Sequence, residues 1–68
     1  MKVKYFPDTD TAFVEFSEKK VYETEEISEN VYIDIDRNGN LVNITIEHAK
    51  VNARLWEFSY QEMIPQNV

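Results

Sequence analysis

The segment that decides the fold runs from residue 31 to residue 46 and reads VYIDIDRNGNLVNITI. On both sides of Asn38-Gly39, β-branched residues alternate with polar ones, which is the pattern of a strand with one face in a core and the other in water. An Asn-Gly dipeptide supplies the positive φ that both central positions of a type I′ hairpin turn need. We therefore predict an antiparallel hairpin with a two-residue turn.

A two-residue turn also fixes the register of this hairpin, because it makes Arg37 face Asn40. Six β-branched residues then share one face of the ribbon in three cross-strand pairs: Ile35 with Val42, Ile33 with Ile44, and Val31 with Ile46. The opposite face is polar. A slip of one residue would mix the two faces, so the turn chemistry and the hydrophobic pattern support the same register independently.

A second hairpin is predicted around residues 7–10, PDTD, a turn cluster between the alternating segments MKVKYF and TAFVEFS. A four-residue loop there separates apolar from charged pairs: Tyr5 with Ala12 and Val3 with Val14 inside, and Lys2 with Glu15 outside. Residues 21–28, VYETEEIS, alternate more weakly and carry more charge. We interpret them as an edge strand whose charges oppose aggregation between strands.

The C-terminal part of the chain has a weaker pattern. Residues 48–54 contain alanine, lysine and arginine, which a short helix tolerates. Residues 55–62 can be interpreted in two ways: Trp56, Phe58 and Tyr60 alternate with polar residues, which favours a strand, whereas Leu55, Phe58 and Glu62 give only a poor helical stripe. We prefer the strand. We call these three residues the aromatic stripe. They are candidate interaction residues, since aromatic side chains often anchor interfaces, and they could equally complete a thin core.

Taken together, these elements predict a mainly β (α+β) fold: a small antiparallel β meander of about five strands with a short helical element near residues 48–54. The 68 residues, 43% hydrophobic and 13% aromatic, are enough for a single domain spanning residues 1–68. A domain this small hides only about 60% of the surface of its unfolded chain. We therefore expect a homodimer, because association would bury more apolar surface.

The charge and cysteine content narrow the classes of function. Thirteen acidic residues against seven basic ones give a net charge of -6, which opposes anionic surfaces, so we expect no nucleic-acid and no membrane partner. The same negative charge favours a basic protein as a partner. The absence of cysteine excludes a disulfide framework and favours a cytoplasmic location. No apolar run has the length of a signal peptide or a membrane span.

An acidic stretch lies between residues 21 and 36, where the sequence has no lysine or arginine. Its acidic residues, which are further candidate interaction residues, are Glu23, Glu25, Glu26, Glu29, Asp34 and Asp36. One interpretation is a solvated edge that discourages aggregation. The other is a surface that docks a basic partner and covers a site that would otherwise bind nucleic acid. The sequence leaves both open.

Three motifs could carry metal or catalytic chemistry. Residues 34–39, DIDRNG, match the opening of a calcium-binding loop, but its twelfth position is Thr45, which cannot give the bidentate carboxylate. His48 beside Glu47 lacks the further ligands of a metal site or a triad. The two aspartates of the PDTD turn are what a loop between strands demands. We therefore assign no catalytic, cofactor-binding or metal-binding residue.

The order and spacing of several short segments carry a resemblance to a known family. These segments are MKVKY at 1–5, Pro7, Asp10, FV at 13–14, FS at 16–17, ETEEI at 23–27, VYIDID at 31–36, Gly39, LV at 41–42, Ile44, Ile46 and Ala49. The pattern resembles the YuzE-like small bacterial proteins, domain-of-unknown-function family 2283, over about residues 1–50. The resemblance implies a compact antiparallel β domain without an established activity or cofactor, and it suggests an antitoxin-type role beside a small toxin-like partner.

The function that we predict from these observations is a non-enzymatic protein–protein interaction module. The narrower alternative is an antitoxin-like protein that masks a small basic toxin with the surface from Glu23 to Asp36. A third alternative is a weak divalent-metal binder or small enzyme that uses Asp8, Asp10, Asp34, Asp36 or His48. The lack of a converging site argues against the third alternative, and no cofactor is expected.

Overall fold

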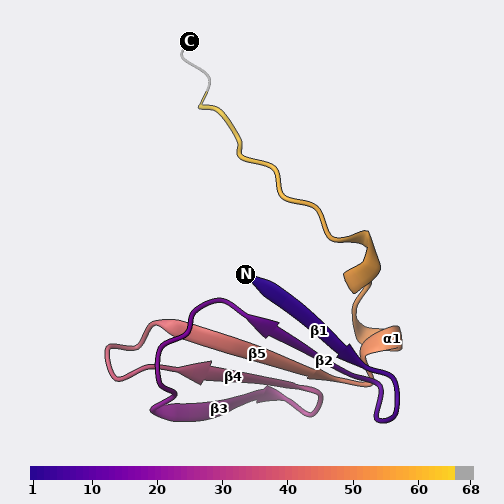
Figure 1. Ribbon diagram of the computed structural model, residues 1–68, viewed down its shortest axis with the longest axis horizontal. Helices are drawn as coiled ribbons and strands as arrows, with labels where there is room; N and C mark the ends of the chain where they lie inside the picture. The colour runs from indigo at the N-terminus through magenta and orange to yellow at the C-terminus, as the bar shows by residue number, and fades with distance from the viewer. Residues whose placement is uncertain (66–68) are drawn as a thin grey trace.

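The computed structural model describes residues 1–65 and contains one five-stranded antiparallel sheet (Figure 1). Its strands are β1 (Lys2–Phe6), β2 (Thr11–Glu15), β3 (Glu23–Ser28), β4 (Val31–Ile35) and β5 (Leu41–Glu47). Two short helical elements follow the sheet: α1 (Ala49–Asn52) and a 3-10 turn, η1 (Leu55–Glu57). The predicted mainly β fold, with five antiparallel strands and a short helix near residues 48–54, is therefore confirmed.

The strand order, β1-β2-β5-β4-β3, differs from a strictly sequential meander at one connection. After β2 the chain crosses through residues 16–22 to the far edge of the sheet and returns as β3, β4 and β5, so β2 pairs with β5. This order places the charged segment ETEEIS at an edge and the apolar β5 in the centre. An edge strand keeps its charges in water, so the predicted edge position of this segment is confirmed.

The N-terminal hairpin has the predicted register. Its pairs include Tyr5 with Ala12, Val3 with Val14, and Lys2 with Glu15. Residues 7–10 connect the two strands, also as predicted. The last loop residue, Asp10, has a φ of 54°, and its carbonyl oxygen accepts the N–H of Ala49 at 2.9 Å. The loop is therefore tied to the start of α1.

The hairpin between β4 and β5 agrees with the prediction in its strands and differs in its turn. The pairs in the structure are Val31 with Ile46, Ile33 with Ile44, and Ile35 with Leu41 rather than Val42. The register shifts between Asp34 and Ile35, because β5 contributes one extra residue there. The predicted pairing of Ile35 with Val42, and with it the two-residue type I′ turn, is therefore wrong.

The turn in the structure contains three residues, 37–39. The carbonyl oxygen of Asp36 accepts the N–H of Gly39 at 3.0 Å, and the N–H of Asp36 donates to the carbonyl oxygen of Asn40 at 2.9 Å. Gly39 has a φ of 82°, whereas Asn38 is not at positive φ, as in a type I turn followed by a left-handed glycine and a bulge. The Asp36 carboxylate selects this turn, because it accepts the N–H groups of Asn38 and Asn40, both at 2.9 Å.

One face of the sheet is apolar, because the registers align two rows of side chains across four strands. The first row is Val3, Val14, Ile44 and Ile33, and the second row is Tyr5, Ala12, Ile46 and Val31. We call these eight residues the apolar face. The opposite face, the polar face, alternates with it along each strand. One of its rows is Lys4, Phe13, Thr45, Tyr32 and Glu26.

Only part of the apolar face is covered. Ala12 and Val14 on β2 are 0% and 7% exposed, whereas Ile33 on β4 and Ile44 and Ile46 on β5 are only half-buried. Among the described residues, no large side chain is completely buried. The sheet is therefore a single layer with a small core near β2, and it lacks a complete second layer over β4 and β5.

The segment after η1 differs from the prediction. Residues 58–65, which we call the arm, form neither helix nor strand, so the strand predicted for residues 55–62 is wrong. Figure 1 shows the arm running away from the sheet. Alternation gives a segment the side-chain pattern of a strand, but a strand also needs a neighbouring strand with which to exchange hydrogen bonds.

Candidate interaction surfaces

The molecule has more surface than a compact domain of its size. Its accessible surface is 5831 Å², whereas a compact folded monomer of 8.1 kDa exposes about 4,500 Å². Its radius of gyration is 14.3 Å, against about 11 Å for a compact domain of 68 residues. The incompletely buried apolar face and the arm both contribute to this extra surface, and each is a candidate interaction surface.

The structure gathers the predicted glutamates at the outer edge of the sheet. Glu23, Glu25 and Glu26 lie on β3, Glu29 follows in the turn to β4, and all four are exposed. The two ion pairs within residues 1–65 involve other carboxylates. The pKa of Tyr32 on the polar face is raised, first by the charge of Glu47, then by burial, and further by Glu26 and Glu29. This edge is therefore a surface of negative charge.

The two predicted aspartates of the acidic stretch are engaged within the chain. The Asp34 carboxylate accepts the hydroxyl of Thr24 at 2.5 Å and the side-chain amide of Asn43 at 3.2 Å. Asp36 is 5% exposed, and the N–H groups that it accepts, that of Asn40 foremost, lower its pKa. These bonds place both residues in a hairpin, and the exposed acidic surface consists of the four glutamates.

The aromatic stripe does not complete a core in the described chain. Trp56 is 66% exposed, Phe58 56% and Tyr60 79%. The stripe begins beside β1, whereas the glutamates lie on β3, so the two sets of predicted interaction residues stand at opposite edges of the sheet. The interpretation of the stripe as core is therefore wrong, and its interpretation as an interface stays a prediction.

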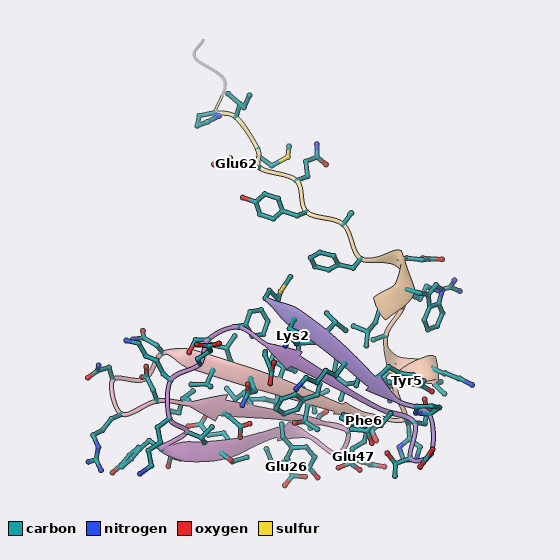
Figure 2. The ribbon with its side chains drawn as sticks, viewed as in Figure 1. Lys2, Tyr5, Phe6, Glu26, Glu47 and Glu62 are labelled. Atoms are coloured by element: carbon teal, nitrogen blue, oxygen red, sulfur yellow. The ribbon has the colours of Figure 1, made fainter. Side chains whose placement is uncertain are left out.

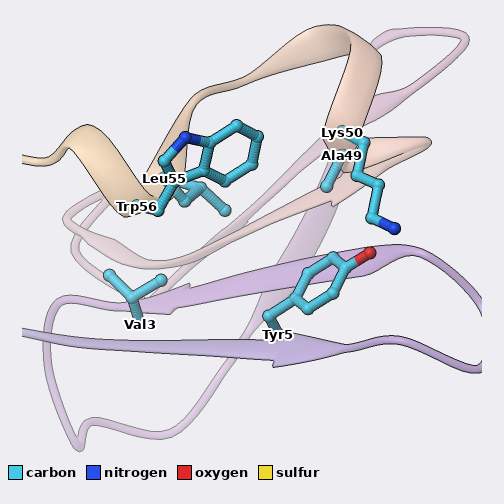
Figure 3. A pocket seen from close by; sticks show the side chains of 6 residues that line it. All are labelled: Val3, Tyr5, Ala49, Lys50, Leu55 and Trp56. Atoms are coloured by element: carbon cyan, nitrogen blue, oxygen red, sulfur yellow. The ribbon is translucent and has the colours of Figure 1, made fainter.

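A hollow between β1 and the helical elements is a feature that the sequence did not reveal. Its volume is about 400 Å³, and its lining consists of Val3, Tyr5, Ala49, Lys50, Leu55 and Trp56. Figure 3 shows the side chains of Val3 and Tyr5 on β1 facing those of the helical elements across it. Sequence alternation marked Val3 and Tyr5 as apolar and Trp56 as aromatic, but no local pattern indicates that they meet.

A polar cluster fixes α1 against the first hairpin. The Tyr5 hydroxyl donates to the Asp10 carboxylate at 2.6 Å, and the N–H of Lys50 donates to the same oxygen at 3.2 Å. The Tyr5 hydrogen bond is the main cause that lowers the pKa of Asp10, and the same bond raises the pKa of Tyr5. Asp10 therefore holds α1 against the first hairpin.

His48 precedes α1 and has a φ of 51°. Its Nδ1 lies 3.0 Å from the side-chain oxygen of Asn30 in the turn between β3 and β4. Within residues 1–65, no group of three or more histidine, aspartate or glutamate side chains is placed to hold a metal ion. No helix in this part of the chain is long and apolar enough to cross a membrane.

Comparison with known proteins gives one match. The model of a family described as "Protein of unknown function (DUF2283)" matches residues 2–50. This range contains the whole sheet and the first half of α1, and it ends before η1 and the arm. Neither the curated proteins nor the solved structures contain a match to the chain.

Proposed function

The chain belongs to the DUF2283 family of proteins of unknown function, and on the evidence of its incompletely buried apolar face we propose that it is a non-enzymatic protein–protein interaction module that acts as a homodimer. A sheet with one apolar face has to bury that face against another layer. In the single chain that layer is incomplete over β4 and β5, where Ile33, Ile44 and Ile46 are half-buried. This incomplete burial is the observation that carries the proposal.

The size of the extra surface fits a second copy. The chain exposes about 1,300 Å² more than a compact monomer of its mass, and a stable interface of standard size buries about 800 Å² on each partner. Two apolar faces packed against each other over β4 and β5 would form a two-layered sandwich with the isoleucines between the sheets. A symmetric dimer needs only one self-complementary surface. The lack of cysteine is consistent with a reducing compartment, and we propose the cytoplasm.

Neighbouring residues on β5 give a matched pair of variants for this proposal. Ile44 lies on the apolar face, whereas Thr45 lies on the polar face. Dimerisation would bury the part of Ile44 that remains exposed in both copies, and a lysine at this position would place two charges between the apolar faces, which is costly. We therefore expect Ile44→Lys to raise the dissociation constant of the dimer at least about 100-fold, as measured by sedimentation velocity.

The control variant Thr45→Lys adds the same charge on the opposite face and should dimerise as the wild type does. Circular dichroism of both variants establishes that the sheet is intact. Equal dissociation constants for the folded Ile44→Lys and Thr45→Lys proteins would contradict an interface on the apolar face.

The four exposed glutamates favour a second proposed function, the binding of a basic protein partner at the β3 edge. Three of them lie on the edge strand β3 and Glu29 follows in the turn, and the ion pairs of the described chain involve other carboxylates. Long-range attraction between this edge and a basic surface would speed association and select the partner. An antitoxin-like protein that masks a basic toxin is the narrower form of this proposal.

Charge reversal tests the second proposal. A triple variant with Glu23→Lys, Glu25→Lys and Glu26→Lys should lose a basic protein that the wild type captures from a native lysate. The matched control reverses three exposed acidic residues elsewhere, namely Asp8, Glu18 and Glu57, and should retain it. Equal capture of that protein by both triple variants would contradict binding at the β3 edge.

A further inference from the structure

The arm carries an unusual amount of apolar surface for a segment without secondary structure. Phe58 is 56% exposed, Tyr60 79%, Met63 75% and Ile64 84%. Within residues 1–65, the last turn or loop backbone hydrogen bond joins the N–H of Phe58 to the carbonyl oxygen of Leu55. Figure 2 shows the arm, with Glu62 on it, standing clear of the sheet. Large apolar side chains gathered in this way are typical of a segment that docks on another surface.

The hollow beside β1 is a surface of matching character. Val3, Leu55 and Trp56 give it apolar walls, and Lys50 contributes to its lining (Figure 3). Its volume of about 400 Å³ lies within the range of cavities that take ligands, about 300–1,000 Å³. An apolar or aromatic side chain with a nearby negative charge would suit it.

The charges at the two free edges of the sheet indicate which edge the arm binds. The arm has one charged residue, Glu62. The β1 edge carries Lys2 and Lys4, of which Lys4 pairs with Glu15 at 3.2 Å, whereas the β3 edge carries three glutamates. All five residues of β1 are exposed, and an edge strand offers unpaired backbone groups to an added strand. The alternation of the arm suits this mode of pairing, and the β1 edge also borders the hollow.

The chain that builds the hollow is poorly placed to fill it with its own arm. Leu55 and Trp56 form one wall of the hollow, and Phe58 follows only two residues later. Filling the hollow from within would require the chain to reverse at once, but residues 55–64 contain no glycine, proline, asparagine or aspartate, and Ser59 is their only residue of a type that favours tight turns. The arm instead continues away from β1 (Figure 1).

We propose that two copies of the chain exchange arms: residues 58–65 of each copy lie along the β1 edge of the other, and Phe58 and Tyr60 face the partner's hollow. This inference rests on the proposed self-association and names a second set of contacts for it. The exchange buries the aromatic residues that the single chain leaves in water. It also brings the carboxylate of Glu62 to an edge that carries lysines.

Engineered cysteines test the exchange directly, because the chain contains no cysteine of its own. A chain with Val3→Cys in the hollow and Tyr60→Cys in the arm should oxidise to a covalent dimer of twice 8.1 kDa on a non-reducing gel. The matched control pairs Val3→Cys with Val51→Cys, at a position that is 86% exposed on α1 and outside the arm. It should form covalent dimer much more slowly. Closure within one chain, or equal rates for both proteins, would overturn the exchange.

Trp56 provides a second measurement, because it is the only tryptophan and lines the hollow. In the wild type, its emission should move to shorter wavelength as the protein concentration rises through the dimerisation range. The variant Phe58→Ala/Tyr60→Ala should lack this shift and remain folded, since both side chains are largely exposed in the single chain. If this variant dimerises and keeps the shift, the exchange is wrong and the proposed homodimer stands. A wild type that stays monomeric overturns both.

Discussion

The β4–β5 turn depends on one residue, Asp36. Its carboxylate accepts two backbone N–H groups, and its own backbone forms two further bonds that close the turn. The Asn38-Gly39 dipeptide alone favours a type I′ turn, whereas an aspartate that bonds the N–H two residues later favours the turn that is found. Asp36 is visible in the sequence, but the prediction did not take its hydrogen bonds into account. These bonds determine the turn type more strongly than the Asn38-Gly39 preference for type I′ does.

The first prediction concerns the pH dependence of stability. The pKa of Asp36 in the fold lies below its value in the unfolded chain, which is about 4. Its ionised form therefore stabilises the fold above about pH 4, and this contribution is lost as the pH falls through the lower pKa of the folded state. Thermal melts followed by circular dichroism should show that Asp36→Asn melts lower near neutral pH and loses less on acidification than the wild type.

The control for this prediction is Asp8→Asn, which removes a carboxylate from the exposed loop between β1 and β2. It should keep the acid dependence of the wild type. A wild-type acid dependence in Asp36→Asn would show that the carboxylate does not hold the turn.

The second prediction distinguishes the two turn types. Gly39 has a φ of 82°, and a side chain there would meet no atom within 4 Å, so Gly39→Ala changes only the backbone energy, by about 1–2 kcal/mol. Asn38 is not at positive φ, so Asn38→Ala should destabilise the fold by less than about 0.5 kcal/mol. Urea denaturation measures the loss of unfolding free energy in both variants. Equal losses for the two variants would indicate a type I′ turn instead.

At the scale of elements, the sequence predicted the strand pairings that form between neighbouring segments of the chain. The registers of β1 with β2, and most of that of β4 with β5, follow from alternation across a short loop. The pairing of β2 with β5 does not, because Val14 and Ile44 meet although they lie thirty positions apart in the sequence. The alternation of Trp56, Phe58 and Tyr60 predicted a strand wrongly, since the single chain places no partner beside it.

The third prediction concerns the attachment of α1. Asp10 accepts the N–H of Lys50 while the Tyr5 hydroxyl holds its carboxylate. Tyr5→Phe removes this restraint, so the amide hydrogens of Ala49 and Lys50 should exchange faster with solvent, as measured by NMR. Tyr22→Phe, beside Arg37 near the β4–β5 turn, is the control and should leave these two amides unchanged. Unchanged exchange in Tyr5→Phe would contradict the docking role of the cluster.

At the scale of the whole molecule, the sequence anticipated a domain too small to bury its apolar residues, and it identified the exposed glutamates. It could not locate the hollow, because the hollow forms where β1 meets α1 and η1, which are far from β1 in the sequence. It also grouped Asp34 and Asp36 with the acidic surface, since charge is visible in a sequence and hydrogen bonding is not. The proposed self-association follows from the single-layered sheet, because an apolar face that is incompletely buried needs a second layer.

The mass of the unmodified chain in solution, measured by light scattering across a dilution series, tests self-association most directly. We predict twice the chain mass of 8.1 kDa at high concentration, with a decline towards the single mass only on dilution. A mass of 8.1 kDa at every concentration would contradict the homodimer, and the apolar face would then have to serve a different protein.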